Sequence, residues 1–304
     1  MKEDQLNIDE TTLAVDLSEA TEAVKESRFE DALNLLKITL KEHPDNIDIL
    51  YLAAVSARYL KKFDDSKKYI EHLLFNAPDM GRAYQELGHL NRDMGDEEKA
   101  VVHYRQACEL NPALLAAWNS LHKYFVKNKN KPAADHALEQ INKLQSLPGV
   151  LLYIDQILNE GRLGLAEAKC RYFLKKNPTH SYAMSLLAEI ANRLGYFDDA
   201  EFLLEKAVEF QPDDGDLRMK YASILRKKQK FAKTMEQVNI LCDKYPDNLT
   251  YQAQKASEIM QNGDHEEAIT LLDDILSKNP FNFSTLTSKG HAQKTLGRTD
   301  QAIK

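Results

Sequence analysis

Residues 81–114 read GRAYQELGHLNRDMGDEEKAVVHYRQACELNPAL, and the spacing of large and small residues in this stretch decides the fold. Tyr84, Leu87 and Gly88 stand three and four residues apart, so they share one face of a helix. Gly95 follows where that helix would end, because the left-handed conformation that stops a helix is least costly for glycine. A second helical stretch then repeats the pattern and closes at a proline: Ala100, Tyr104, Ala107 and Pro112. The stretch therefore predicts two antiparallel helices joined at Gly95.

The closing proline recurs at a fixed interval. Pro44, Pro78 and Pro112 are 34 residues apart, and the interval returns at Pro178, Pro212, Pro246 and Pro280. A period in this range is the signature of a stacked repeat protein. Proline suits the end of each unit, since it removes an amide donor and disfavours the helical conformation in the residue before it. The gap from Pro112 to Pro178 is 66 residues, two short of two periods, so the fourth unit is predicted to be irregular.

The pattern resembles the tetratricopeptide repeat, whose unit is 34 residues long. The resemblance covers the chain from about Leu13 onward and implies an all-α fold, a right-handed superhelical α-solenoid of antiparallel helix pairs. The expected units are 13–46, 47–80, 81–114, 115–146, 147–180, 181–214, 215–248, 249–282 and a partial unit 283–304. Residues 1–12 are expected to be a disordered N-terminal extension. The irregular fourth unit keeps its register at Trp118, Leu121, Phe125, Ala134 and Leu138.

Small residues recur at two positions of the unit, where the paired helices must approach closely. Position 8 holds Ala20, Ala54, Gly88, Ala188, Ala222, Ala256 and Gly290. Position 20 holds Ala32, Ala100, Ala134, Ala166, Ala200, Ala268 and Ala302. These residues are predicted to be buried between helices.

Composition narrows the class of protein. The 304-residue chain is 43% hydrophobic and 29% charged, with a net charge of -7, so it lacks the basic footprint of a nucleic-acid-binding protein. No apolar run is long enough to cross a membrane, and the start MKEDQLNIDE has no apolar signal core. A cytoplasmic protein is expected. Cys108, Cys170 and Cys242 are predicted to be reduced thiols packed on the second helix of their units.

The sequence offers no catalytic motif. Glycine-rich phosphate loops, a nucleophile elbow and metal-ligand spacings of His and Cys are absent. Asp213, Asp214, Gly215 and Asp216 lack the later glutamate of a calcium loop and are predicted to form a solvated turn. Acidic pairs such as Glu97 and Glu98 suit the positive end of a helix dipole. We therefore predict no enzyme activity, no catalytic residue, no cofactor and no metal in this chain.

The resemblance implies that helix residues at positions 2, 5, 9, 12 and 13 line a concave groove that binds a protein or peptide. In the first two units these positions give a partly apolar entry: Leu17, Val24, Tyr51, Val55, Arg58 and Tyr59. The predicted groove residues further on are polar and mostly basic: Arg82, Gln85, His89, Arg92, Asn119, Lys123, Lys127, Asn192, Arg193, Arg226 and Lys227. Basic side chains in an acidic protein favour an acidic segment or a terminal carboxylate as ligand. The Lys and Asn pair of chaperone-tail clamps occurs here only in swapped order, as Asn119 and Lys123, which does not support that function.

A narrower resemblance concerns residues 171–213 and 288–303. They are similar to bacterial proteins in which tetratricopeptide repeats precede a sulfotransferase domain, and the matching residues include Gly290, His291, Ala292, Lys294 and Arg298. The loop that binds the phosphosulfate donor has no counterpart. This resemblance implies an alternative function, a substrate- or partner-docking arm of a sulfotransferase. In the partial last unit, Leu296 and Ile303 lack their expected cover, which predicts self-association through this end.

Overall fold

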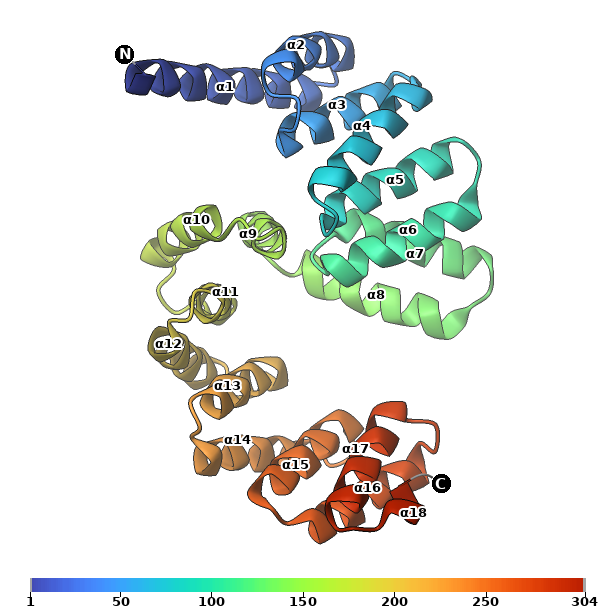
Figure 1. Ribbon diagram of the computed structural model, residues 1–304, viewed down its shortest axis with the longest axis vertical. Helices are drawn as coiled ribbons and strands as arrows, with labels where there is room; N and C mark the ends of the chain where they lie inside the picture. Colours follow the sequence, from blue (N-terminus) through green and yellow to red (C-terminus); the bar gives the residue numbers. More distant parts are fainter. Residues whose placement is uncertain (1, 303–304) are drawn as a thin grey trace. The chain divides into compact units, whose positions relative to one another are not determined.

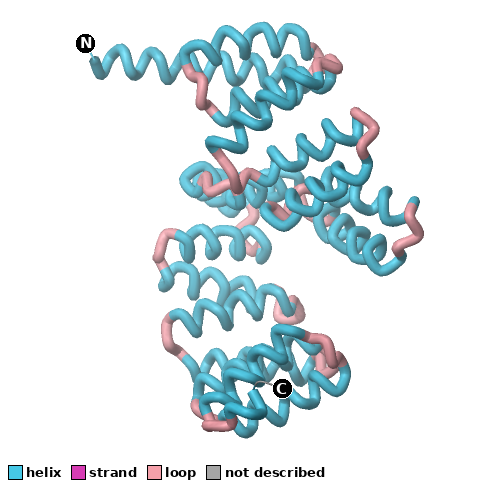
Figure 2. The backbone as a smooth tube through the Cα atoms, turned by 45° about the vertical axis from the view of Figure 1, so that its right-hand side comes forward, coloured by secondary structure: helices cyan, strands magenta, loops and turns pink. Residues whose placement is uncertain are grey.

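The structure is a computed structural model that describes residues 2–302, and every regular element in that range is a helix. Figure 1 shows the helices in chain order, and Figure 2 shows the short loops that join them. Their bounds are α1 Lys2–Lys25, α2 Phe29–Glu42, α3 Ile47–Tyr59, α4 Phe63–Asn76, α5 Gly81–Asp93, α6 Glu97–Leu110, α7 Leu115–Lys127, α8 Lys131–Gln145, α9 Gly149–Asn159, α10 Leu163–Lys176, α11 Ser181–Arg193, α12 Phe197–Phe210, α13 Gly215–Lys227, α14 Phe231–Lys244, α15 Leu249–Asn262, α16 His265–Lys278, α17 Phe283–Thr295 and α18 Thr299–Ala302. The predicted all-α fold of sequential helix pairs is confirmed.

The chain forms two compact units, Met1–Arg162 and Leu163–Lys304. In the first unit, each helix from α1 to α8 packs against the next one along the chain, and α1, α3, α5 and α7 also contact each other in turn. In the second unit, the same consecutive packing runs from α10 to α18. This is the nearest-neighbour arrangement in which a solenoid buries its apolar surface.

The first helix is longer than expected. Residues 2–12 are helical and run without a break into the rest of α1. The helix meets the core further along, where Ala20 and Ala23 are buried against α2 and α3. A continuous helix therefore leads into the first helix pair.

Each turn inside a helix pair has one residue in the left-handed conformation. Five of these residues are glycine, as expected: Gly95, Gly161, Gly195, Gly263 and Gly297. The remaining four have a side chain at the same position and still adopt φ between 55° and 61°: Ser27, Lys61, Lys129 and Gln229. Every turn thus has the same backbone geometry, and the chain keeps it even at residues whose side chains make the left-handed conformation unfavourable.

The small residues at positions 8 and 20 allow the close packing predicted from the sequence. Ala54, Ala188, Ala200 and Ala268 are completely buried. At Gly88, a β carbon would come within 2.6 Å of the Tyr104 ring, which is itself 2% exposed. The helices α5 and α6 can therefore approach to this distance only because position 88 has no side chain.

The fourth helix pair, α7 and α8, differs from the predicted register. Leu121, Phe125 and Ala134 are buried as expected, but Leu138 is 41% exposed. The buried stripe of α8 instead consists of Ala134, Ala137, Ile141 and Leu144. These residues are three or four apart, and Leu138 lies one residue outside the stripe, so it turns toward solvent.

Three further sequence predictions concern the cysteines, a membrane-spanning helix and the last helix pair. Cys108 and Cys170 are buried, which raises the pKa of both thiols to about 12, whereas Cys242 is only half-buried. No helix within residues 2–302 combines the length and apolar character needed to cross a bilayer. Leu296 is 36% exposed, and Ile303 lies outside the described residues, so self-association through this end stays a prediction.

Candidate functional site

Arg82 belongs to the predicted groove residues, but it is engaged within the first unit. Its guanidinium forms a bidentate ion pair with Glu160, with Nη2 lying 2.7 Å from Oε2, and stacks over the Tyr51 ring at 4.7 Å. The Glu160 side chain is 3% exposed and that of Arg82 is 19% exposed. A buried guanidinium that already has a bidentate carboxylate is poorly available to a partner.

The Glu160 contact is one of several that hold α9 against helices far earlier in the chain. Arg162 donates from Nη1 to Asp48 at 3.1 Å, across 114 residues of sequence. Gln156 donates to the Ala113 carbonyl at 3.1 Å, and Asn111 donates back to the Gln156 carbonyl at 3.2 Å. The fifth repeat therefore binds the second and third, which departs from nearest-neighbour packing. The fourth repeat, which is two residues short, directly precedes α9 in the chain.

Between α1, α3, α5 and α9 lies a cleft of about 460 Å³. The residues that line it include Asp48 and Tyr51 of α3, Arg82 of α5, Tyr153 of α9 and Arg162, which follows α9. Arg82 and Arg162 share Asp48, at 3.8 Å and 3.1 Å. Because these charges largely neutralise one another, the entry region predicted from the first two units has little net charge to attract a ligand.

Arg58 was predicted to face the groove, and the structure corrects this. Arg58 is 6% exposed, lies 2.5 Å from Glu86 and donates to Asp93 at 2.8 Å. Burial acts to raise the pKa of Asp93, but hydrogen bonds from Arg92 and Arg58 outweigh it and lower that pKa. Arg58 thus ties α3 to α5 and does not line a binding surface.

His89 and Gln85 complete the predicted groove residues of α5. His89 Nδ1 lies 2.7 Å from the Tyr104 hydroxyl. Burial, with the nearby positive charges of Arg58 and Arg92, lowers the pKa of His89 to about 4, so the imidazole is neutral near pH 7. Gln85 is half-buried, and its side chain has no hydrogen-bond partner among residues 2–302. His89 is therefore a neutral hydrogen-bonding group and adds no positive charge to the groove.

Three of the predicted groove residues do come together. Arg92 of α5 and Lys123 and Lys127 of α7 line one pocket of about 220 Å³, with α6 forming its wall. We call this the α5–α7 pocket; its other lining residues are Glu97, Ala100, Val101, Tyr104, Ser120 and Tyr124. It combines three cations with hydroxyl groups and an apolar wall.

The cations of the α5–α7 pocket differ in how they are paired. Arg92 contacts Asp93 at 2.8 Å, and Lys127 contacts Glu97 at 2.6 Å, both through side chains that are at least 28% exposed. Lys123 is exposed and has no ion-pair partner within residues 2–302. Exposed pairs of this kind contribute about 0–1 kcal/mol, so an incoming anion can replace them at little cost. The pocket is therefore suited to an anionic ligand.

Asn119 does not join this pocket. Its side-chain amide donates to the Leu115 carbonyl of its own helix at 2.8 Å. The swapped Asn119 and Lys123 pair therefore does not converge on one ligand position, which agrees with the sequence-based argument against a chaperone-tail clamp.

The four predicted residues of the second unit are engaged with one another or with carboxylates. Lys227 donates to Asn192 at 2.7 Å, and Arg193 donates to Glu189 at 2.8 Å. Arg226 pairs with Glu258, whose side chain is 4% exposed. The Lys227 contact links α11 to α13 and the Arg226 contact links α13 to α15, whereas the Arg193 contact lies within α11.

Sequence reasoning missed several residues of the α5–α7 pocket. The sequence assigns Tyr104 and Ala100 only to helix packing, and it gives no role to Ser120. Tyr124 stands at position 10, outside the positions that the resemblance places in the groove. The pocket is formed where two repeats meet, so no single set of repeat positions defines it. In the described part of the chain, no group of three or more His, Cys, Asp and Glu side chains could hold a metal ion.

The fold and this surface define a class of protein: an α-solenoid of helix pairs with a polar pocket between adjacent repeats. Models of the tetratricopeptide repeat match residues 17–61, 81–114 and 158–254, which together make up more than half of the chain. The chain is a tetratricopeptide repeat protein. All three matches are to repeats of a kind typical of non-catalytic scaffolds, and none is to a catalytic domain.

Solved structures resemble the fold at low sequence identity. The APC/C hetero-tetramer Cut9–Hcn1 matches with a TM-score of 0.42 and 15% identity, over 91% of this chain and 55% of that chain. Naa15/Naa10 bound to HypK-THB matches with a TM-score of 0.39 and 16% identity, over 92% of this chain and 44% of that one. MamA, residue 41 to the end, from Desulfovibrio magneticus RS-1 matches with a TM-score of 0.46 and 10% identity, over 51% and 87%. This chain spans about half the length of the first of these proteins, and the likeness concerns the fold alone.

Proposed function

We propose that this tetratricopeptide protein is a scaffold that binds an acidic segment of a protein partner in the α5–α7 pocket. The observation that carries the proposal is the convergence of Arg92, Lys123 and Lys127 on one pocket, with Lys123 unpaired among the described residues.

The lining of the pocket narrows the ligand further. A carboxylate placed at Lys123 could also receive hydrogen bonds from Arg92 and Lys127, and charge-assisted bonds of this type are about twice as strong as neutral ones. Ala100, Val101 and the Tyr124 ring offer an apolar wall beside these cations. We therefore expect an acidic residue next to an apolar one in the bound segment.

A peptide titration tests the site. The probe is a fluorescein-labelled eight-residue peptide of alternating Asp and Leu, and its twin has Asn in place of every Asp. The full-length protein should bind the Asp peptide, and K123E should weaken that binding about tenfold or more, as expected for loss of a charge-assisted bond. Lys37, an exposed residue of α2 without an ion-pair partner in the described part, supplies a matched control, because K37E changes the net charge equally.

Two results would contradict the proposal. Equal affinities for the Asp and Asn peptides would show that the pocket does not select an anion. Equal losses in K123E and K37E would show that only the net charge matters. The selective loss in K123E should also shrink as the salt concentration rises, because both partners are exposed.

A second proposal rests on the resemblance of residues 171–213 and 288–303 to the repeats of bacterial sulfotransferases. In that case the repeats would dock a substrate or partner for a catalytic domain outside these 304 residues. The support is the sequence resemblance alone. Reading the genomic frame beyond Lys304 tests it, and a stop codon there with no sulfotransferase frame nearby contradicts it.

A further inference from the structure

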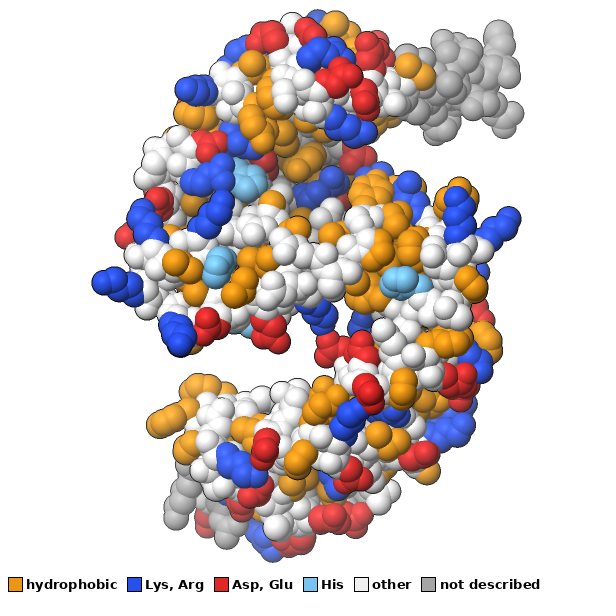
Figure 3. Space-filling view, turned by 180° about the vertical axis from the view of Figure 1, so that it is seen from behind, with side chains coloured by type: hydrophobic (Ala, Val, Ile, Leu, Met, Phe, Trp, Pro, Cys, Tyr) orange, Lys and Arg blue, Asp and Glu red, His pale blue; other side chains and the backbone are white. Residues whose placement is uncertain are grey.

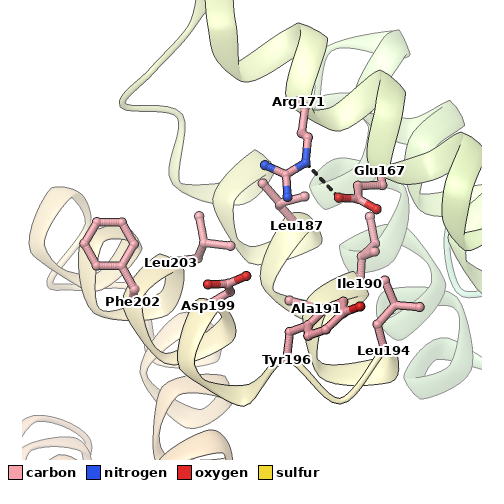
Figure 4. Close-up of a pocket in the computed structure, with 10 residues that line it drawn as sticks. All are labelled: Glu167, Arg171, Leu187, Ile190, Ala191, Leu194, Tyr196, Asp199, Phe202 and Leu203. Atoms are coloured by element: carbon pink, nitrogen blue, oxygen red, sulfur yellow. Dashed lines mark hydrogen bonds and ion pairs between the residues drawn. The ribbon is translucent and has the colours of Figure 1, made fainter.

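A second pocket, of about 240 Å³, lies in the second unit between α10 and α12, with α11 as its floor (Figure 4). Its floor is apolar: Leu187, Ile190 and Ala191 are at most 8% exposed, and Leu203 covers one side. None of the predicted groove residues, Asn192 and Arg193 of α11 included, lines this pocket. The pocket is thus separate from the predicted groove residues. We call it the α10–α12 pocket.

Large apolar side chains stand exposed around this pocket. Tyr196 is 61% exposed, Phe202 is 58% exposed and Leu194 is 42% exposed. All three line the pocket. Exposed apolar clusters rimmed by polar groups mark interaction surfaces more often than ordinary surface. Figure 3 shows apolar patches and charged side chains of both signs over the face that it presents.

One carboxylate in the pocket has no ion-pair partner among the described residues. Arg171 donates from Nε to Glu167 at 2.8 Å, so these two charges match. Asp199 has no partner within the described residues, whereas its neighbour Asp198 pairs with Lys228. Asp199 is exposed, and in Figure 4 its carboxylate lies beside Leu203 and Ala191 in the pocket. The pocket therefore has an apolar floor and one unmatched negative charge.

We propose that the α10–α12 pocket binds a lysine or arginine side chain presented by an apolar segment of a partner protein. Such a side chain has an apolar stem, which would lie on Leu187 and Ala191, and a cationic head, which would reach Asp199. The Tyr196 ring at the rim adds an aromatic face, and cations are attracted to such faces. Contacts of this kind occur elsewhere in the second unit, where Lys176 lies over the Tyr172 ring at 4.6 Å and Lys227 over the Phe197 ring at 5.9 Å.

The test uses three peptides that differ at one position. The probe is Gly-Ser-Leu-Lys-Leu-Ser-Gly, and its twins have norleucine or glutamate in place of lysine. Norleucine keeps the apolar stem and removes the charge. Titrations of the full-length protein, followed by the backbone amide shifts of residues 195–203, should give a dissociation constant for the lysine peptide up to about fivefold lower than for the norleucine peptide. The glutamate peptide should bind most weakly.

Variants test whether the preference for the lysine peptide over the norleucine peptide comes from the α10–α12 pocket. D199N should reduce the lysine-to-norleucine ratio to about one while leaving the norleucine peptide unchanged. D247N is the matched control, since Asp247 is exposed in the same unit and has no partner in the described part; it should keep the full ratio. A191M should fill the floor and weaken the lysine and norleucine peptides together, with thermal melting used to confirm that it folds.

The inference is overturned if the lysine peptide does not bind, if it binds no better than norleucine, or if D199N keeps the ratio. It is also independent of the proposed function. K123E, in the first unit, should leave the lysine peptide unaffected, and D199N should leave the Asp peptide of the α5–α7 pocket unaffected. Failure of one site can therefore be distinguished from failure of the other.

Discussion

Replacing Arg82 by alanine separates a structural role from a binding role for the first of the predicted groove residues. The substitution leaves the Glu160 carboxylate, 3% exposed, without its bidentate partner. Removing one member of a buried ion pair costs about 3–5 kcal/mol, because the remaining charge stays desolvated. Arg82 itself is 19% exposed and has a second carboxylate, Asp48, at 3.8 Å, so we place the expected loss near the lower end, about 3 kcal/mol.

The protein contains its own probe for this measurement. Trp118 is the only tryptophan and lies in the first unit, so its fluorescence during urea unfolding reports on the unit that contains Arg82. The free energy of unfolding should fall by about 3 kcal/mol in R82A. The double variant R82M/E160Q should lose clearly less, because well-packed neutral groups can replace a buried ion pair at small cost.

Arg92 supplies the control. Its pair with Asp93 is exposed, and R92A should change the free energy of unfolding by no more than about 1 kcal/mol. The reasoning is refuted if R82A unfolds within about 0.5 kcal/mol of the wild type, or if R92A is equally costly. In the first case Glu160 would not be held as the structure places it, and Arg82 would be available to a partner; in the second, burial of the ion pair would not set its contribution to stability.

Three further outcomes follow from the packing. G88A should lower the free energy of unfolding by about 1–3 kcal/mol, since its β carbon would lie 2.6 Å from the buried Tyr104 ring. G164A, with nothing within 4 Å of its β carbon, should be neutral or stabilising; circular dichroism during urea unfolding, which reports on helices of both units, measures both variants. Q229G should raise the thermal midpoint, because Gln229 has φ of 57° and glycine removes a strain of about 1–2 kcal/mol; an unchanged or lower midpoint would contradict this. The pKa of His89 is lowered to about 4, so as the pH falls the unfolded state binds the proton before the folded state does. The free energy of unfolding should therefore fall by roughly 3 kcal/mol between about pH 6.5 and pH 4. H89Q should remove this loss, and the same pH profile in H89Q and the wild type would refute the assignment.

Much of the helix array followed from the sequence because a repeat fold is specified locally. Each turn at position 15 needs a residue in the left-handed conformation, and glycine at five of these positions predicts the turn. Small residues such as Ala54 and Ala200 mark where paired helices touch. Neighbouring repeats supply nearly all of these contacts, so the period of the sequence already contains the information.

The candidate sites could be predicted only in part. The sequence placed Arg92, Lys123 and Lys127 on the inner helix positions, and the structure brings these three together. It could not show that Arg82 faces Glu160, since 78 residues separate them. Nor could it show that Asp199 lies unpaired over an apolar floor, because that depends on which charges on three helices find partners.

The amino-acid sequence by itself thus determined the helix pairs, their turns and their close-packed small residues, because these depend on spacing within 34 residues. Tertiary structure alone decided which charged side chains form ion pairs within the protein and which face a ligand. The shortened fourth repeat precedes α9, whose Glu160 and Arg162 pair with Arg82 and Asp48 across long stretches of chain. Charge pairing over such distances depends on how repeats stack, and stacking is a property of the folded array that no single repeat contains.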